Sequence, residues 1–203
     1  MINHFPNFVC WEEVFQQYRP SRDVLYIDAL SCHLVGFMLG VRGVYFSGPQ
    51  MANRLDKAGI ENVYFLLAEE IQSIQPDRGF VMEFKESFEG DENVLAFLRT
   101  VPKDGVLVLG LSSPKQNVLA SYLHSKRPDI EYFCLGAAVK QTWGFTYANT
   151  KLRGTGLQWL EFLLLQPRRT AAKLSKTLVE ALKVVSSIQR LKLFRRFVIA
   201  TKI

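Results

Sequence analysis

The sequence predicts an α/β protein with an open, mostly parallel, doubly wound sheet and a basic helical appendage at its C-terminal end. Strand-like runs rich in Val, Ile, Tyr and Phe alternate with helical patterns, as this fold class requires. Several runs, Val106–Leu109 most clearly, are apolar at every position, as expected for parallel strands covered by helices on both faces. With 203 residues, 48% of them apolar, the chain is long enough to bury its own core.

Six strands are predicted from runs of β-branched and aromatic residues. In chain order they are Val24–Asp28, Val44–Gly48, Val63–Ala68, Gly79–Phe84, Val106–Leu111 and Glu131–Gly136. Apolar residues at three- and four-residue steps predict the helices between them. These fall near Trp11–Tyr18, Leu30–Leu39, Gln50–Ala58, Asp91–Thr100 and Lys115–Ser125. No internal repeat or long linker interrupts the alternation, and the composition changes only at Pro167.

The net charge of +6 is concentrated at the C-terminal end. Residues 1–167 hold 15 Lys and Arg against 18 Asp and Glu, whereas residues 168–203 hold 10 against Glu180 alone. Apolar residues recur there at helical spacing, among them Leu174, Leu178 and Leu182. A basic amphipathic helix of this kind is typical of an anionic membrane surface. We therefore predict a core, residues 1–167, and a membrane-associating helical tail, residues 168–203.

Two other interpretations of the tail stay open. A terminal helix packed on its own domain, with a solvated basic face, would show the same pattern. A nucleic-acid binder fits less well, because the aromatic residues of the tail do not alternate with glycine or polar residues as in a base-stacking platform. We therefore expect no nucleic-acid partner.

The remaining composition excludes several protein classes. The three cysteines and three histidines are scattered, which argues against a disulfide framework, a zinc ribbon or another metal site. No apolar run reaches the length of a membrane span, and the N-terminus lacks the layout of a signal peptide. The sequence thus predicts a cytoplasmic protein without a metal or cofactor.

Ligands of doubly wound sheets bind beyond the carboxyl ends of the strands, so the residues there are the candidates for a site. The fifth predicted strand runs into Gly110-Leu111-Ser112-Ser113-Pro114-Lys115-Gln116. Such a helix start would leave backbone N–H groups pointing outward beside Lys115, which suits a diphosphate or sugar oxygens; a plain helix cap would look the same. Asp28 ends the first predicted strand and is a candidate general base, or else a cap of the next helix.

These residues resemble the WecG/TagA/CpsF family of bacterial glycosyltransferases. The segment from Gly110 to Gln116 is similar to the family's Gly-x-(Gly/Ala)-(Ser/Ala)-Pro-Lys-Gln signature. Residues 156–169, which read Gly-Leu-Gln-Trp-Leu-Glu-Phe-Leu-Leu-Leu-Gln-Pro-Arg-Arg, resemble its Gly-Leu-Glu-Trp-Leu…Glu-Pro-Arg-Arg block. The blocks occur in the family's order, and the resemblance extends over most of the chain. Asp28 falls at the family's Pro-Asp-Gly motif, and Gly48 corresponds to the glycine of its Arg-Val-x-Gly segment.

The resemblance implies an inverting, metal-independent transferase with a Rossmann-like core. Members move a sugar from a UDP donor, commonly UDP-N-acetylmannosamine, to a saccharide on polyprenyl diphosphate. They work at the cytoplasmic face of the cell membrane in the synthesis of surface polysaccharides such as exopolysaccharide. Members can self-associate, so the resemblance is compatible with a homo-oligomer.

The same resemblance assigns residues to roles. Asp28 is implied to be the catalytic base. Donor or acceptor contacts are implied for Gly48, Gly110, Ser113, Pro114, Lys115 and Gln116, and diphosphate contacts for Arg168 and Arg169. Asn7 matches the family's Thr-Pro-Asn motif in part. From the residues themselves, Arg153 precedes a Gly-Thr-Gly turn from which it can reach an anion, or it is a solvated loop cation.

Several positions depart from the family's pattern, mainly on the expected donor side. Pro-Asp-Gly reads Ile27-Asp28-Ala29, the family's arginine falls at Tyr45, its Gly-rich turn reads Ala68-Glu69-Glu70, and its Gly-Gly-Ser-Phe-Asp segment ends in Lys140. These changes leave two alternatives to an ordinary member. One is a different donor sugar. The other is a catalytically silent relative that binds a nucleotide-sugar or a partner enzyme in a polysaccharide assembly complex.

Overall fold

The computed structural model describes residues 1–6, 9–27, 40, 46–58, 62–69, 71, 73–75, 77–82, 91–144, 164 and 167–201. The chain forms two compact units, which are described separately. The first comprises Met1–His4, Arg19–Val24 and Gly48–Ala148, and the second comprises Phe5–Tyr18, Leu25–Ser47 and Asn149–Ile203. The predicted helix near Leu30–Leu39 and the start of the predicted strand Val44–Gly48 lie outside the described residues.

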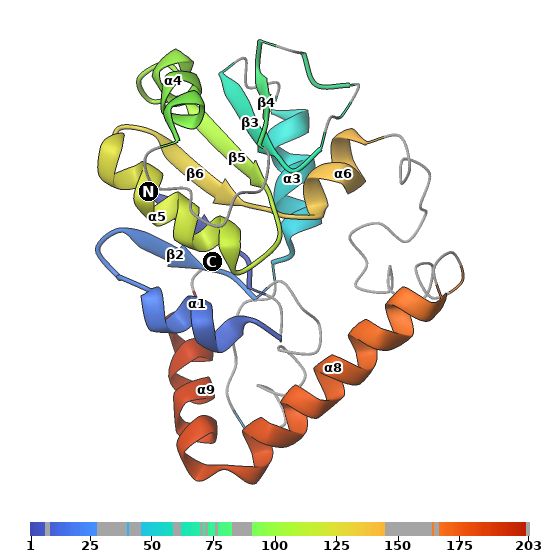
Figure 1. Cartoon of the computed structure of the whole chain (residues 1–203). Coiled ribbons are helices and arrows are strands. Elements are labelled where there is room, and N and C mark those ends of the chain that lie inside the picture. The colour runs from blue at the N-terminus through green and yellow to red at the C-terminus, as the bar shows by residue number, and fades with distance from the viewer. Residues whose placement is uncertain are drawn as a thin grey trace. The chain divides into compact units, whose positions relative to one another are not determined.

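A six-stranded, all-parallel sheet runs through the fold in the order β2-β1-β6-β5-β3-β4 (Figure 1). Its strands are β1 (Ile2–His4), β2 (Asp23–Leu25), β3 (Val63–Leu67), β4 (Gly79–Val81), β5 (Val106–Gly110) and β6 (Glu131–Cys134). In the middle of the sheet, Val106 of β5 lies opposite Val63 on one side and Glu131 on the other. The predicted open α/β architecture with a parallel sheet is confirmed.

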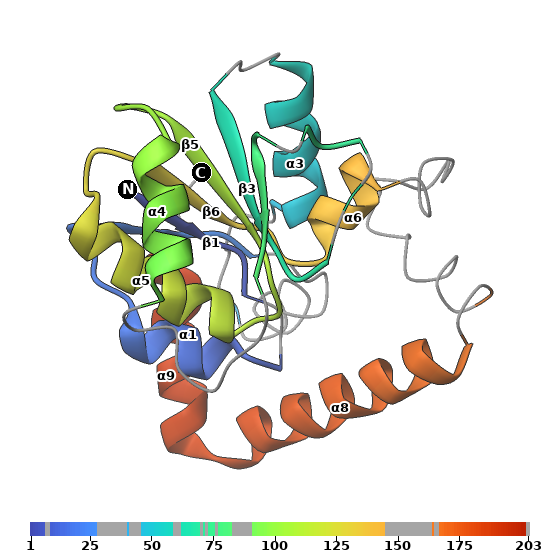
Figure 2. The ribbon, with the colours of Figure 1, turned by 45° about the horizontal axis from the view of Figure 1, so that its top comes forward.

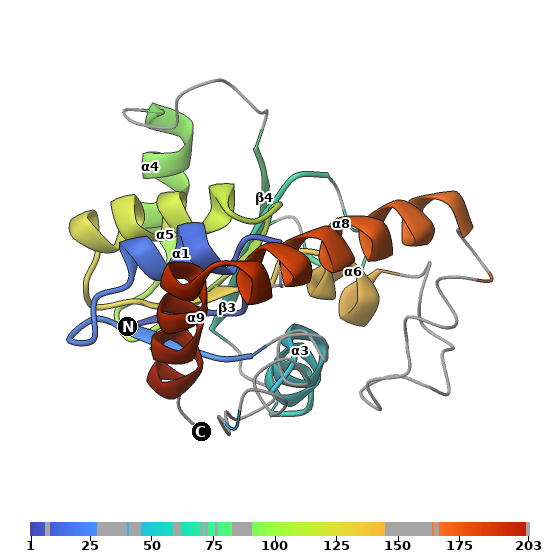
Figure 3. The same ribbon diagram turned by 90° about the horizontal axis from the view of Figure 1, so that it is seen from below.

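Helices cover both faces of the sheet in the first unit. Figure 2 and Figure 3 show α4 (Glu92–Thr100) and α5 (Lys115–Lys126) on one face, and α3 (Gly48–Lys57) and α6 (Ala138–Trp143) on the other. Leu107 and Leu109 of β5 belong to the same buried cluster as Leu119 and Leu123 of α5. The intervening Val108 is also buried and points to the opposite face, because side chains alternate along a strand. Both faces of β5 are therefore core, as its sequence predicts.

Two elements of the first unit differ from the prediction. β1 was not expected from the strand pattern, since it is three residues long and two of them, Asn3 and His4, are polar. It nevertheless pairs with β6, with Ile2 opposite Tyr132. Gly48 was expected to end a strand, but it begins α3, where Pro49 is tolerated because the first helical turn needs no N–H from it.

The second unit contains α1 (Trp11–Gln17), α8 (Pro167–Ser186) and α9 (Ile188–Ala200). Trp11 is fully buried, and its ring lies 5.1 Å from that of Phe194 and 5.5 Å from that of Phe197. Their cluster is completed by Cys10, Val14, Leu25, Ile27, Val184 and Val198. The two tail helices thus supply part of a core. The compact units accordingly divide the chain differently from the predicted core, residues 1–167, and tail, residues 168–203.

An arginine joins α1, α8 and α9. Arg190 of α9 forms ion pairs with Glu12 of α1 and with Glu180 of α8, the latter at 2.8 Å. Glu180, the one acidic residue of the tail, is buried. Its carboxylate serves the packing of the unit and also pairs with the exposed Lys183 of α8 at 3.4 Å, so it offsets part of the basic charge of that helix. In the described part of the chain, no helix has the length and apolar character needed to cross a membrane.

Candidate functional site

The turn between β5 and α5 places the predicted binding segment at the carboxyl edge of the sheet. Gly110 is the last residue of β5 and Lys115 is the first of α5, so residues 111–114 form the turn between them. From this edge β3 leads to β4 on one side, whereas β5 leads to β6 on the other. The ends of β3 and β5 are therefore a topological switch point, the usual place for a ligand in an open α/β sheet.

The two glycines of this edge have structural reasons to be glycine. A Cβ on Gly110 would lie 3.0 Å from Cδ2 of Leu67 and 3.4 Å from Cβ of Val139, so β3 and α6 pack closely against the end of β5. Gly136 has a φ of +54°, which L side chains rarely adopt, and lets the chain turn from β6 into α6. Gly110 thus fixes the position of the turn through packing.

Two backbone N–H groups at the start of α5 are bonded within the turn and do not point outward. The N–H of Gln116 donates to the carbonyl of Ser112 at 3.1 Å, and that of Asn117 donates to the carbonyl of Pro114 at 2.9 Å. Both donors are consumed because the turn folds back onto the start of α5. The prediction of a free N–H cradle is wrong for these two residues.

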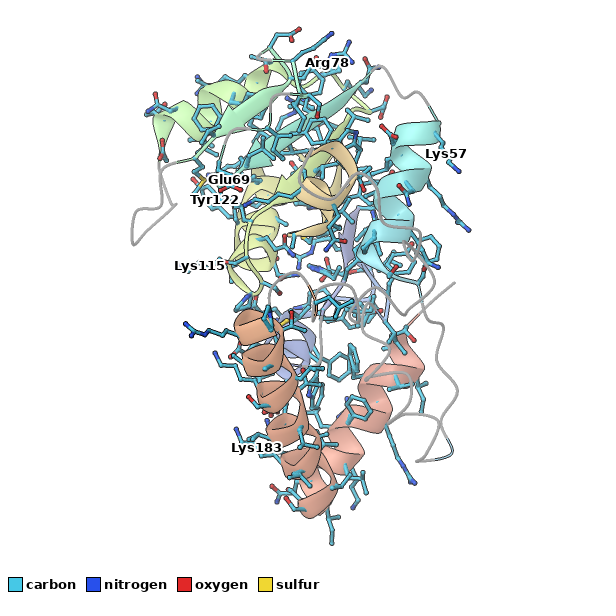
Figure 4. The ribbon with its side chains drawn as sticks, turned by 90° about the vertical axis from the view of Figure 1, so that its right-hand side faces the viewer. Lys57, Glu69, Arg78, Lys115, Tyr122 and Lys183 are labelled. Atoms are coloured by element: carbon cyan, nitrogen blue, oxygen red, sulfur yellow. The ribbon has the colours of Figure 1, made fainter. Side chains whose placement is uncertain are left out.

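Side chains at the turn differ strongly in exposure. Lys115 is exposed at the first residue of α5 (Figure 4), and Ser113 is half-buried. Gln116 is 3% exposed, and its Nε2 donates to the carbonyl of Cys134 at 3.0 Å. The Oε1 atom of Gln116 is buried and has no hydrogen-bond partner among the described residues. Ser113 and Lys115 are thus the predicted contacts that the turn leaves accessible, while Gln116 ties α5 to the end of β6.

Of the other predicted site residues, Pro114 is the last residue of this turn, whereas the rest are at the start of α3, in α8 of the second unit, or outside the described residues. Asp28, Asn7 and Arg153 lie outside the described residues. Gly48 is buried at the start of α3. Pro114 directly precedes α5. Arg168 is exposed on α8, and Arg169 lies in the same helix with its side chain outside the described part.

Next to Ser113 lies a buried polar network that the sequence did not reveal. The Ser113 hydroxyl donates to Oδ1 of Asn117 at 2.9 Å, and Nδ2 of Asn117 lies 2.8 Å from Nδ1 of His4. The Nε2 atom of His4 faces Oδ1 of Asp23 at 3.7 Å. His4, Asp23 and Asn117 are 3%, 2% and 1% exposed. The sequence carries no local signal for it, because the residues come from β1, β2 and α5.

Asp23 is the charged centre of this network. Its carboxylate accepts hydrogen bonds from Nε of Arg22 at 2.6 Å and from the Arg19 N–H at 2.8 Å. Burial alone would raise the pKa of Asp23, but the nearby His4 ring and the hydrogen bonds from Arg22 and the Arg19 amide outweigh it and hold the pKa well below its usual value. The carboxylate therefore stays anionic, and the network keeps a fixed negative charge at one end.

Asp23→Asn is expected to lower the free energy of unfolding at pH 7 by about 3 kcal/mol, because it leaves buried cationic and polar partners without their counter-charge. Because the pKa of Asp23 is lower in the folded than in the unfolded protein, its ionised carboxylate stabilises the fold fully above the unfolded pKa of about 3.9. This stabilisation is lost as the pH falls from that value toward the folded pKa. In urea unfolding, the difference in unfolding free energy between Asp23→Asn and wild type should therefore be smaller at pH 3 than at pH 7. The exposed Asp56→Asn change serves as the control. Equal losses at both pH values would contradict the electrostatic origin.

Two departures from the family's pattern meet in the structure. Lys140 of α6 forms an ion pair with Glu69, which follows β3. Their side chains are 42% and 57% exposed, so the pair lies at the surface of the carboxyl edge. A carboxylate and a cation that each looked out of place in the sequence therefore neutralise one another.

The described residues hold no cluster of three or more His, Cys, Asp or Glu side chains that suits a metal ion. Comparison of the chain with known protein families, with curated proteins and with solved structures finds no match in any of the three.

Proposed function

We propose that this chain is an inverting, metal-independent glycosyltransferase. It moves a sugar from UDP-N-acetylmannosamine or another UDP-hexose to a polyprenyl-diphosphate-linked saccharide in bacterial surface-polysaccharide synthesis. One observation carries the proposal. The segment from Gly110 to Gln116, one of the two blocks on which the family resemblance rests, runs from the end of β5 through the turn into α5, at the switch point of a parallel sheet.

In the proposed reaction, Asp28 accepts the proton of the acceptor hydroxyl while its oxygen attacks the anomeric carbon. The bond from that carbon to UDP breaks, and the configuration inverts. Lys115, with Arg168 and Arg169, stabilises the charge of the departing diphosphate. An ordinary Asp has a pKa of about 3.9, so the reaction relies on a raised pKa or on a transition state with oxocarbenium character.

We further propose that α8 rests on an anionic membrane at the cytoplasmic face. Leu174, Leu178, Leu182 and Val185 recur at steps of four and three residues, share one face, and are 42–63% exposed. Exposed Lys176 and Lys183 lie on the side of the same helix opposite this stripe, since each residue turns the helix by about 100° (Figure 4 labels Lys183). Apolar residues beneath headgroups and cations at headgroup level are the arrangement of an interfacial helix.

The tail proposal predicts a loss of membrane binding when charge is removed from α8. Lys176→Gln with Lys183→Gln should weaken binding to vesicles containing phosphatidylglycerol by about 30-fold, since each cation contributes about 1 kcal/mol near an anionic surface. The matched control is Lys57→Gln with Lys103→Gln, two exposed lysines of the first unit. Vesicle sedimentation measures both pairs, and equal losses would contradict a specific role of α8.

The activity is tested with the purified full-length chain. UDP binding is measured by calorimetry, and UDP release from UDP-N-acetylmannosamine is followed in the presence of membrane extract as the source of lipid-linked acceptor. The proposal predicts both binding and acceptor-dependent release. Absence of both overturns it.

Binding without release would favour the second candidate, a catalytically silent relative that holds a nucleotide-sugar or a partner enzyme. The ion pair between Glu69 and Lys140 is the observation in its favour, since it occupies positions where the family has a Gly-rich turn and an acidic residue. Glu69→Gln tests whether the nucleotide binds at this edge in either candidate. If a nucleotide binds at this edge, loss of the Glu69 carboxylate beside Lys140 should change the affinity for UDP.

A further inference from the structure

The hydrogen-bond network beside the turn has one consistent arrangement of protons, which begins at Asp23. Two contacts from Arg22, at 2.6 and 2.9 Å, and the Arg19 N–H at 2.8 Å hold its carboxylate in place. A carboxylate in this setting only accepts hydrogen bonds. The ring atom that faces this carboxylate is Nε2 of His4, which complements an acceptor only when it carries a proton.

The other ring nitrogen of His4 leads to the same result. Nδ1 of His4 lies 2.8 Å from Nδ2 of Asn117, both buried. An amide nitrogen can only donate, so Nδ1 must accept and carries no proton. With the proton on Nε2 of His4, this orientation of the Asn117 amide turns its oxygen toward Ser113.

The amide oxygen of Asn117 determines the role of the Ser113 hydroxyl. Oδ1 of Asn117 accepts the hydrogen bond from Oγ of Ser113 at 2.9 Å. A serine hydroxyl has one proton and two lone pairs, and this bond uses the proton. Any further group that meets Oγ of Ser113 must therefore be a donor. Phosphate oxygens at neutral pH are acceptors, whereas sugar hydroxyls donate.

We infer that Ser113 is a specificity-determining residue whose hydroxyl accepts a hydrogen bond from a sugar hydroxyl of the ligand and does not bind its phosphates. The assignment of the ligand as a UDP-sugar rests on the proposed function. The acceptor role of the Ser113 hydroxyl toward a ligand, which we call its polarity, does not. His4 and Asn117 are positioning residues that act through Ser113. The neighbouring Lys115, exposed at the start of α5, is the group suited to phosphate.

The polarity is tested without any ligand. Long-range ¹H–¹⁵N spectra of the full chain, labelled at histidine, report which ring nitrogen of His4 carries the proton at pH 7.5. His33→Gln and His124→Gln variants assign the other two signals. The inference predicts a protonated Nε2 and a bare Nδ1. A protonated Nδ1 would reverse the Asn117 amide, make Ser113 a donor and overturn the inference.

The ligand preference is tested with Ser113→Ala and two probes, UDP-N-acetylmannosamine and inorganic diphosphate. Loss of one neutral hydrogen bond should weaken binding of the UDP-sugar about fivefold and leave diphosphate within twofold. Ser113→Thr, which keeps the hydroxyl, should restore the affinity, and Ser125→Ala at the far end of α5 is the control. Equal weakening of both probes overturns the inference. If either probe fails to bind the wild-type protein, the proposed function and the ligand named here are overturned. The His4 tautomer would still decide whether the Ser113 hydroxyl donates or accepts a hydrogen bond.

Discussion

Removal of residues 167–203 is expected to unfold the second unit of the protein, beyond any loss of membrane association. The deletion takes away Val184, Phe194, Phe197 and Val198, which surround Trp11. Each large-to-small change at such a site costs about 3–5 kcal/mol for an aromatic residue, so losing all four exceeds the marginal stability of an ordinary domain. Near-ultraviolet circular dichroism and limited proteolysis of residues 5–18 measure the result.

A point variant tests the same cluster without a deletion. Phe194→Ala should lower the unfolding free energy by about 3–5 kcal/mol, because Phe194 is fully buried against Trp11. Ile199→Ala on the same helix, where the side chain is 70% exposed, should change it by less than about 0.5 kcal/mol. A truncated chain that keeps native aromatic dichroism would show that α8 and α9 are a dispensable appendage.

Asp28→Asn is expected to reduce turnover by about 10²–10⁴-fold, the usual contribution of a general base. The amide is nearly the same size as the carboxylate but cannot accept the acceptor's proton, so UDP affinity and thermal stability should stay close to wild type. The assay is the rate of UDP release with a lipid-linked acceptor, with Asp56→Asn as the surface control. Retained turnover in Asp28→Asn would remove Asp28 from the mechanism.

The sheet was predictable from sequence wherever a local pattern carries the information. β5 has apolar residues on both faces, and α4 begins directly after Asp91, whose carboxylate accepts hydrogen bonds from the N–H groups of Asn93 and Val94. β1 was missed because its position depends on distant partners. Its polar His4 is compatible with the core only because Asp23 and Asn117 satisfy it there.

The candidate site was predictable in place but not in detail. The carboxyl end of β5 follows from the fold class, whereas the fate of each polar group depends on contacts made after folding. The Gln116 amide is buried against the Cys134 carbonyl, which a helix start does not reveal. Likewise, Glu69 and Lys140 are 71 positions apart, and only the fold shows that they form a pair.

The tail, residues 168–203, also shows that sequence predicts an element but not its contacts. Its apolar residues at helical spacing predict an amphipathic helix, which α8 and α9 confirm. The sequence does not divide these residues into two groups. Val184 and Phe194 are fully buried within the second unit, while Leu178 and Leu182 are 63% and 57% exposed. Only the exposed group is available to a membrane.

The central claim is that a UDP-sugar binds at the carboxyl edge of the sheet, around the turn after β5. A titration of the ¹⁵N-labelled full chain with UDP, followed through its amide signals, tests it most directly. The account predicts shifts in residues 111–116 and 135–140, which follow the ends of β5 and β6. Shifts confined to residues 103–106 and 129–131, at the opposite ends of the same strands, or no shifts at all, would contradict it.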